Sequence, residues 1–251
     1  MPEKYINYKE NYSWRRTLSI SFLIFITFSI FQISTLFILL FIDGLDLNSI
    51  DLNAEIIESA SYSHIASIST ISGLFGILLT IYFSKFIINP KSKSSKIKIQ
   101  EILPLKKPAL KEIVVWLTIL ISYSIFISII SNWFGAIDDV DFTMQVLNKS
   151  KNNILLFYGI GVAQPIFEEF LFRGVLFKGL LHKLGGLLTV LITSFLFVLP
   201  HIQYDFNVLA LILFPNALIL GFSRLKTKSL TVPIILHCAN NILTLIIGIL
   251  N

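Results

Sequence analysis

Three charged residues lie inside an otherwise apolar stretch of the sequence, FEEFLFRG at 167–174. Glu169 and Arg173 are four residues apart, so on a helix they share one face and are expected to form an ion pair. Glu168 lies about 100° further round such a helix and is left without that arginine. An unpaired carboxylate in apolar surroundings is costly, which makes Glu168 a candidate general base.

Two histidines occupy comparable apolar stretches, FLFVLPH and ILHCANN. His237 and Asn241 are four residues apart, so a helix directs both of them toward one bound group. Phe197 and His201 repeat this spacing, which places an aromatic ring one turn from the other histidine. A single buried histidine more often bonds a neighbouring helix than catalyses a reaction. The combination of these positions with Glu168 is what indicates a site.

The composition indicates the elements that position these residues. Of the 251 residues, 55% are hydrophobic and 14% are charged, whereas an ordinary soluble domain has about 25% charged residues. Apolar runs of about 20 residues are typical of transmembrane helices. The expected fold is therefore an all-α, polytopic transmembrane helix bundle. About seven spans are expected, at 17–42, 62–88, 113–134, 153–183, 186–203, 206–224 and 229–250.

Basic residues cluster at the ends of these runs, as they do in membrane proteins, and this argues against a nucleic-acid partner. The loop at 90–112 is rich in lysine, whereas the stretch at 43–60 carries only acidic charges. By the positive-inside rule, we expect a multi-pass protein of the cell membrane with its N-terminus, residues 90–112 and residues 224–229 in the cytoplasm. The basic loop is then expected to lie near anionic membrane lipid.

A proline precedes each of the three candidate groups, in the pairs Pro165 and Glu168, Pro200 and His201, and Pro233 and His237. Proline bends a helix and frees backbone carbonyls. At membrane depth, such irregular backbone is tolerated where it lines a cavity. We therefore expect an active-site pocket inside the bundle, walled by the fourth, fifth and seventh spans.

Two mechanisms are open for this set of residues. Glu168, His201 and His237 are ligand types of a catalytic zinc that keeps one position for water. Without a metal, Glu168 and His201 would take a proton from water while His237 and Asn241 donate to the developing oxyanion. Both routes hydrolyse an amide. The sequence contains neither HExxH nor GxSxG, the signatures of common zinc and serine hydrolases.

The motifs EEFLFR, FVLPH and HCANN fit the patterns EExxxR, FxxxH and HxxxN in this order. In these motifs the chain resembles the CPBP family of intramembrane proteases, also called the CAAX prenyl endopeptidase and bacteriocin-processing family or the Abi family. The resemblance implies a protease core at 111–251, preceded at 1–110 by membrane spans and the basic cytoplasmic loop. It also implies roles for individual residues: Glu168 and His201 activate water, His237 and Asn241 stabilise the oxyanion, and Glu169, Arg173 and Phe197 support the site.

The function implied by the resemblance is an intramembrane endopeptidase that hydrolyses a peptide bond of a membrane-associated peptide or protein with Glu/His-activated water. It requires no cofactor in one version of the mechanism and zinc in the other. The alternative is a non-catalytic membrane protein, an immunity factor or scaffold that binds a bacteriocin or a signalling partner. In that case the same polar residues are structural hydrogen-bond partners.

Overall fold

The chain is described by a computed structural model that covers residues 12–42, 54–88, 98–134, 147–148, 150, 153–202 and 204–250. These residues form helices and no β-strand. Two short 3-10 segments, η1 and η4, and three π-helical segments, η2, η3 and η5, interrupt or extend the α-helices. The elements in chain order are α2 (Trp14–Ile42), α3 (Ala54–Ser84), η1 (Lys85–Ile87), α4 (Ile99–Ile102), α5 (Leu110–Phe134), α7 (Asn153–Tyr158), η2 (Gly159–Ala163), α8 (Gln164–Glu169), η3 (Phe170–Leu176), α9 (Phe177–Leu184), α10 (Gly186–Val198), η4 (Leu199–His201), α11 (Phe206–Val208), η5 (Leu209–Leu213), α12 (Phe214–Thr227) and α13 (Thr231–Leu250).

The expected helix bundle is confirmed, and the protein is a multi-pass membrane protein. Within the described residues, six helices are long and apolar enough to cross a membrane: Trp14–Ile42, His64–Ile87, Leu110–Ile130, Asn153–Leu184, Phe206–Thr227 and Thr231–Leu250. The fifth expected span, 186–203, is a shorter apolar helix at Gly186–His201. Such a helix is about 24 Å long, which is less than the roughly 30 Å of a bilayer core.

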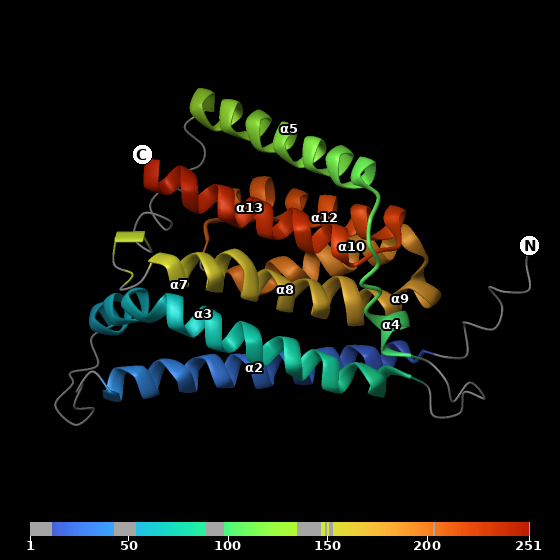
Figure 1. The fold of residues 1–251 in the computed structure, drawn as a ribbon, viewed down its shortest axis with the longest axis horizontal. Helices are drawn as coiled ribbons and strands as arrows, with labels where there is room; N and C mark the ends of the chain where they lie inside the picture. The colour runs from blue at the N-terminus through green and yellow to red at the C-terminus, as the bar shows by residue number, and fades with distance from the viewer. Residues whose placement is uncertain are drawn as a thin grey trace, which may run out of the picture.

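The segment Asn153–Leu184 runs through the middle of the bundle, with α2 and α3 on one side and α10, α12 and α13 on the other (Figure 1). Half of its most apolar window is buried, against 6% for the span in α5, which lies at the outer edge against α12 and α13. The beginning of α2 and the end of α13 lie at opposite ends of the bundle (Figure 1). An odd number of passes along the bundle agrees with the seven expected segments.

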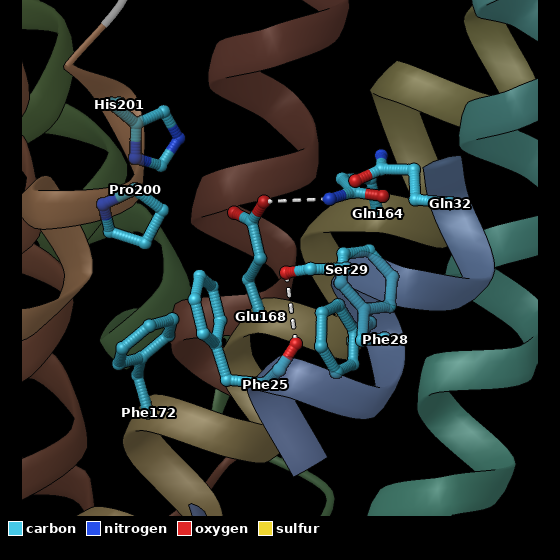
Figure 2. A pocket seen from close by; sticks show the side chains of 10 residues that line it. Phe25, Phe28, Ser29, Gln32, Gln164, Glu168, Phe172, Pro200 and His201 are labelled. Atoms are coloured by element: carbon cyan, nitrogen blue, oxygen red, sulfur yellow. Dashed lines mark hydrogen bonds between the residues drawn. The ribbon is translucent and has the colours of Figure 1, made fainter. Parts of the chain in front are cut away.

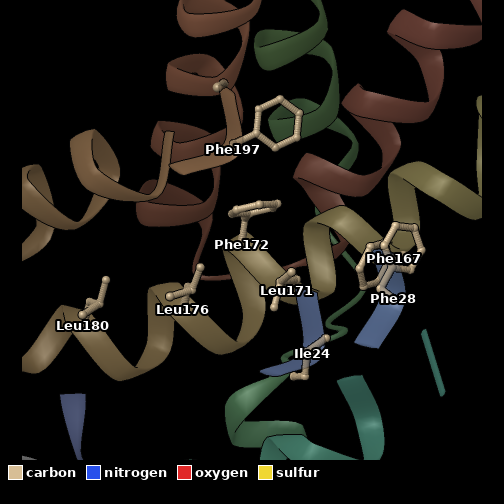
Figure 3. Packing of buried hydrophobic residues seen from close by; sticks show 9 residues of the cluster. Ile24, Phe28, Phe167, Leu171, Phe172, Leu176, Leu180 and Phe197 are labelled. Carbon is tan, nitrogen blue, oxygen red and sulfur yellow. The ribbon is translucent and has the colours of Figure 1, made fainter. Parts of the chain in front are cut away.

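Aromatic and aliphatic side chains fix α2 to the central segment. Phe28 of α2 stacks on Phe167 with ring centroids 4.1 Å apart, and both belong to one buried cluster with Ile24 and Leu171 (Figure 3). Burying a side chain of this size stabilises the fold by about 1.5–3 kcal/mol. The position of α2 beside the acidic residues is therefore set by the core of the protein.

The three π-helical segments have one feature in common. In each of them, one backbone carbonyl accepts a hydrogen bond from a side chain of another helix. The pairs are Asn241 with Ile160 in η2, Arg224 with Arg173 in η3, and Tyr123 with Leu211 in η5. Proline follows within two residues of η2 and η5, and its missing N–H interrupts the regular α-helical bonding. The carbonyls that this irregular backbone leaves without a partner in their own helix accept hydrogen bonds from side chains of other helices, as burial at membrane depth requires.

Candidate active site

Glu169 and Arg173 form the ion pair that their spacing predicts. Nη1 of Arg173 lies 3.3 Å from Oε1 of Glu169, and both side chains are completely buried. Arg173 also donates from Nη2 to the carbonyl of Ala217 at 2.9 Å, and its guanidinium lies 4.6 Å from the centre of the Phe197 ring. The pair thus connects the central segment to α12 and to α10.

Glu169 has a second partner that the sequence did not reveal. Nδ1 of His237, on α13, lies 3.0 Å from the same Oε1 atom. Because an ionised carboxylate only accepts, Nδ1 carries the hydrogen of this bond. The other ring nitrogen, Nε2, is turned toward Glu168 and lies 3.7 Å from its Oε2 atom. His237 therefore lies between two carboxylates, and Glu169 fixes both its orientation and its tautomer.

Glu168 is the one of the two acids that reaches a cavity. Its side chain is 12% exposed, whereas that of Glu169 is fully buried. Gln164, one turn earlier on α8, donates from Nε2 to Oε1 of Glu168 at 3.2 Å (Figure 2). The expectation that Glu168 has no partner is therefore wrong. The i, i+4 spacing in QPIFE was the signal for this contact.

His201 lines the same cavity as Glu168. Its Nδ1 atom is 2.9 Å from the carbonyl oxygen of Phe197, and since a carbonyl only accepts, Nδ1 carries the hydrogen. This leaves Nε2 with a free lone pair. The imidazole also lies against the Phe197 ring, with centroids 5.1 Å apart, as the FxxxH spacing predicts. The same ring contacts His237 at 5.6 Å, so Phe197 holds both histidines in place.

Asn241 is engaged elsewhere. Its Nδ2 atom donates to the carbonyl of Ile160 in η2 at 3.0 Å. The spacing alone suggests that His237 and Asn241 point at one oxygen. In the structure, His237 faces the two glutamates and Asn241 faces η2. One of the two amide hydrogens of Asn241 is therefore already in use, and a single one remains for a ligand.

The cavity beside Glu168 has a volume of about 230 Å³. Its walls come from α2, α8, η3 and η4, and α2 contributes Phe25, Phe28, Ser29 and Gln32. The expected pocket has walls from the fourth, fifth and seventh spans; this cavity has walls from the fourth and fifth, with α2 in place of α13. The reason is that α13 reaches α8 through His237, while Phe28 fixes α2 on the cavity side (Figure 2).

The three expected zinc ligands do not form a metal-binding group in this arrangement. Among the residues that the structure describes, no three side chains of the types His, Cys, Asp and Glu gather closely enough to hold an ion. Glu168 and His201 line the cavity, whereas His237 is not among its lining residues and is bonded to Glu169. The residues as they stand do not fit a three-ligand zinc site.

Residues 150–243 match the family described as type II CAAX prenyl endopeptidase Rce1-like. This part of the chain is similar to that family. An uncharacterized 24.3 kDa protein of Escherichia coli is 37% identical over 98 residues, which are 38% of this chain and 45% of the relative. The membrane-embedded CAAX protease MroQ of Staphylococcus aureus (strain USA300) is 29% identical over 104 residues, which are 39% of this chain and 40% of MroQ. The chain thus spans less than half the length of these curated relatives. No solved structure matches it.

The match confirms the resemblance drawn from the three motifs, and the Rce1-like segment contains all the acidic, basic and histidine side chains described above. It does not contain α2, which forms one wall of the cavity. The contribution of α2 was missed because an amphipathic pattern is absent from this uniformly apolar helix. Its one signal was Gln32, the only side-chain amide in the run from 17 to 42.

Proposed function

We propose that the protein is an intramembrane endopeptidase that cleaves a peptide bond of a membrane-associated peptide or protein. The observation that carries this proposal is the position of Glu168, whose carboxylate lines a cavity inside the bundle together with His201. The Rce1-like match of residues 150–243 supports the reaction class. The active centre consists of Glu168, His201, His237 and Asn241, supported by Glu169, Arg173, Phe197 and Gln164.

In the proposed reaction, a water molecule in the cavity is activated by Glu168 and His201. Nε2 of His201 has a free lone pair because Nδ1 donates to Phe197, so it accepts a hydrogen bond from this water. Glu168 takes the proton as the water oxygen attacks the scissile carbonyl. It then returns the proton to the leaving amine, which restores the carboxylate. Gln164 holds Oε1 of Glu168 and leaves Oε2 as the basic atom.

His237 is proposed to stabilise the oxyanion of the tetrahedral intermediate in its doubly protonated form. With Nδ1–H donating to Glu169, the neutral ring has only a lone pair on Nε2 and has nothing to donate. Nε2, which would carry the second proton, is turned toward Glu168 and lies 3.7 Å from its Oε2 atom. The remaining amide hydrogen of Asn241 is the second proposed donor. This mechanism requires no metal.

Replacing Glu168 by glutamine tests the function. The change keeps the shape of the side chain and removes the base, so we expect cleavage to fall by about 10²–10⁴-fold. Cells with the wild-type protein, Glu168→Gln and the control Glu112→Gln are compared by peptidomics of membranes and medium. Glu112 lies at the start of α5, where an amide oxygen can still accept the bond from Ala109.

Peptides that disappear in Glu168→Gln cells and persist in Glu112→Gln cells are the expected result. Identical peptide profiles in wild-type and Glu168→Gln cells, at equal protein levels, would overturn the proposed protease and favour a non-catalytic binding protein.

A further inference from the structure

We propose that α2 is the substrate-binding wall of this site and that Gln32 binds the main chain of the substrate beside the cleaved bond. The proposal rests on the proposed protease function. It concerns a helix that lies outside the Rce1-like segment, and it assigns the choice of substrate to that helix.

Gln32 differs from the hydroxyl residues nearest to it on α2. Ser29, Ser34 and Thr35 each donate to the carbonyl four residues earlier, so their hydroxyl groups are satisfied within the helix. Gln32 makes no hydrogen bond with any residue that the structure describes, although it lies in a span and faces the cavity. A side-chain amide without partners is costly at membrane depth. Its presence in an otherwise apolar helix is explained if a ligand supplies the partner.

A second unsatisfied amide atom belongs to a residue that lines the same cavity. Nε2 of Gln164 donates to Glu168, but Oε1 of Gln164 is buried without a hydrogen-bond partner in the described part of the chain. Both amides line the cavity, and in the view of Figure 2 they are drawn at one side of the Glu168 carboxylate, with His201 at the other side. The cavity thus offers hydrogen-bond acceptors and donors directly adjacent to the proposed base.

An extended peptide has the groups that these amides lack. A chain that is to be cleaved inside a membrane must be unwound, and each unpaired N–H and C=O then costs several kcal/mol. A glutamine amide has one acceptor and two donor hydrogens, so it can bond the N–H and the C=O of one extended residue. A main chain bound in this way by Gln32 passes the Glu168 carboxylate. The expected ligand is therefore an unwound peptide segment.

The floor of the cavity adds a preference for apolar side chains. The rings of Phe25 and Phe28 lie on either side of the Glu168 side chain (Figure 2). Phe28 is held by its stacking on Phe167, so this surface is preformed. The substrate residue whose main chain Gln32 binds is expected to place an apolar side chain against these rings.

Kinetics on backbone-modified peptides test the role of Gln32. Internally quenched peptides are made from the sequences that depend on Glu168 in the peptidomic comparison, each also with one backbone nitrogen near the cleaved bond methylated. The purified protein in lipid nanodiscs is compared with Gln32→Leu, Gln32→Asn and the control Ser34→Ala. Ser34 lies on the same helix, is exposed, and is bonded to Ile30.

We expect Gln32→Leu to raise KM about fivefold with kcat unchanged, as the loss of one uniform binding hydrogen bond does. Gln32→Asn is expected to raise KM as well, because the asparagine side chain is one methylene group shorter and its amide does not reach as far. Methylation of one particular nitrogen should raise KM for the wild-type protein and have no further effect on Gln32→Leu, because the two changes remove the same bond.

A KM for Gln32→Leu equal to that of Ser34→Ala, or equal methylation effects in the wild type and Gln32→Leu, would refute the proposal. The proposed function fails separately, since it falls only if Glu168→Gln cleaves these peptides like the wild type. A lower melting temperature of Gln32→Leu in detergent would also count against the proposal, because it would show that the amide serves the fold.

Discussion

Replacing Glu169 by glutamine separates the two roles that the structure gives this side chain. Its Oε1 atom lies 3.3 Å from Nη1 of Arg173 and 3.0 Å from Nδ1 of His237. Glu169 and Arg173 are both completely buried, and breaking a buried pair costs about 3–5 kcal/mol. For a chain of this size we expect the melting temperature in detergent to fall by roughly 10 °C.

Glu169→Gln is also expected to lose activity, for a different reason than its loss of stability. The bond from Nδ1 to Glu169 fixes the orientation and the tautomer of His237, and comparable changes behind a catalytic histidine reduce kcat by up to about 10⁴-fold. We therefore expect Glu169→Gln to lose cleavage as well as stability. Adding Arg173→Met removes the uncompensated buried cation and should restore part of the stability. The restoration is incomplete, since Arg173 also donates to Ala217.

The decisive measurements are the melting temperature and single-turnover cleavage of the single and double variants. We expect the double variant to melt above Glu169→Gln and to remain inactive. If the double variant recovers cleavage together with stability, Glu169 serves only as the partner of Arg173, and its assigned effect on His237 is wrong. If Glu169→Gln melts at the same temperature as the wild type, the buried ion pair does not contribute to stability, and the expected cost of about 3–5 kcal/mol is refuted.

Three further outcomes are expected. Protein depleted of metal with a chelator stays active; stoichiometric zinc, with activity lost on chelation and restored by zinc, would contradict this. Asn241→Ala reduces cleavage by about 10²-fold, as loss of an oxyanion donor does. It also reduces the free energy of unfolding by about 1 kcal/mol, because the carbonyl of Ile160 loses its donor. An unchanged rate with lowered stability would make Asn241 purely structural. A cysteine at Lys107 in a Cys238→Ser background escapes an impermeant reagent in intact cells, because the positive-inside rule puts this loop in the cytoplasm; labelling there would reverse the topology.

Contacts within one helix were predictable from the sequence. The pair of Glu169 and Arg173 and the stacking of Phe197 on His201 both follow from a spacing of four residues, and both are present. The long apolar runs likewise predicted the helices. The bounds differ for α3, which begins at Ala54 rather than at 62, inside the stretch expected to be an outer loop, and for Gly186–His201, where the expected span ran two residues beyond the helix and Pro200 lies in a 3-10 turn.

Contacts between helices were not predictable in the same way. His237 and Asn241 share a face of α13, but packing gives His237 to Glu169 and Asn241 to Ile160. The sequence of α2 also lacks a polar face, so it does not show which side of this helix packs against the other helices. Its place at the cavity is decided by the stacking of Phe28 on Phe167, a contact between residues far apart in the chain. No role was predicted for Gln32, and only the fold shows that it lines the same cavity as Glu168.

The bond between Asn241 and the π-helical segment η2 bears on how related sequences diverge. A π-turn holds one residue more than an α-turn, so η2 is equivalent to an insertion of one residue into a regular helix. A relative that lost one residue between 159 and 163 would close η2 into an α-helix, and the carbonyl now capped by Asn241 would bond within its own helix. The amide at position 241 would then be released from this role. Because Asn241 would keep its proposed oxyanion role, such a relative is expected to retain this residue with both amide hydrogens available to a ligand, although Ile160 and Asn241 are 81 residues apart in the chain.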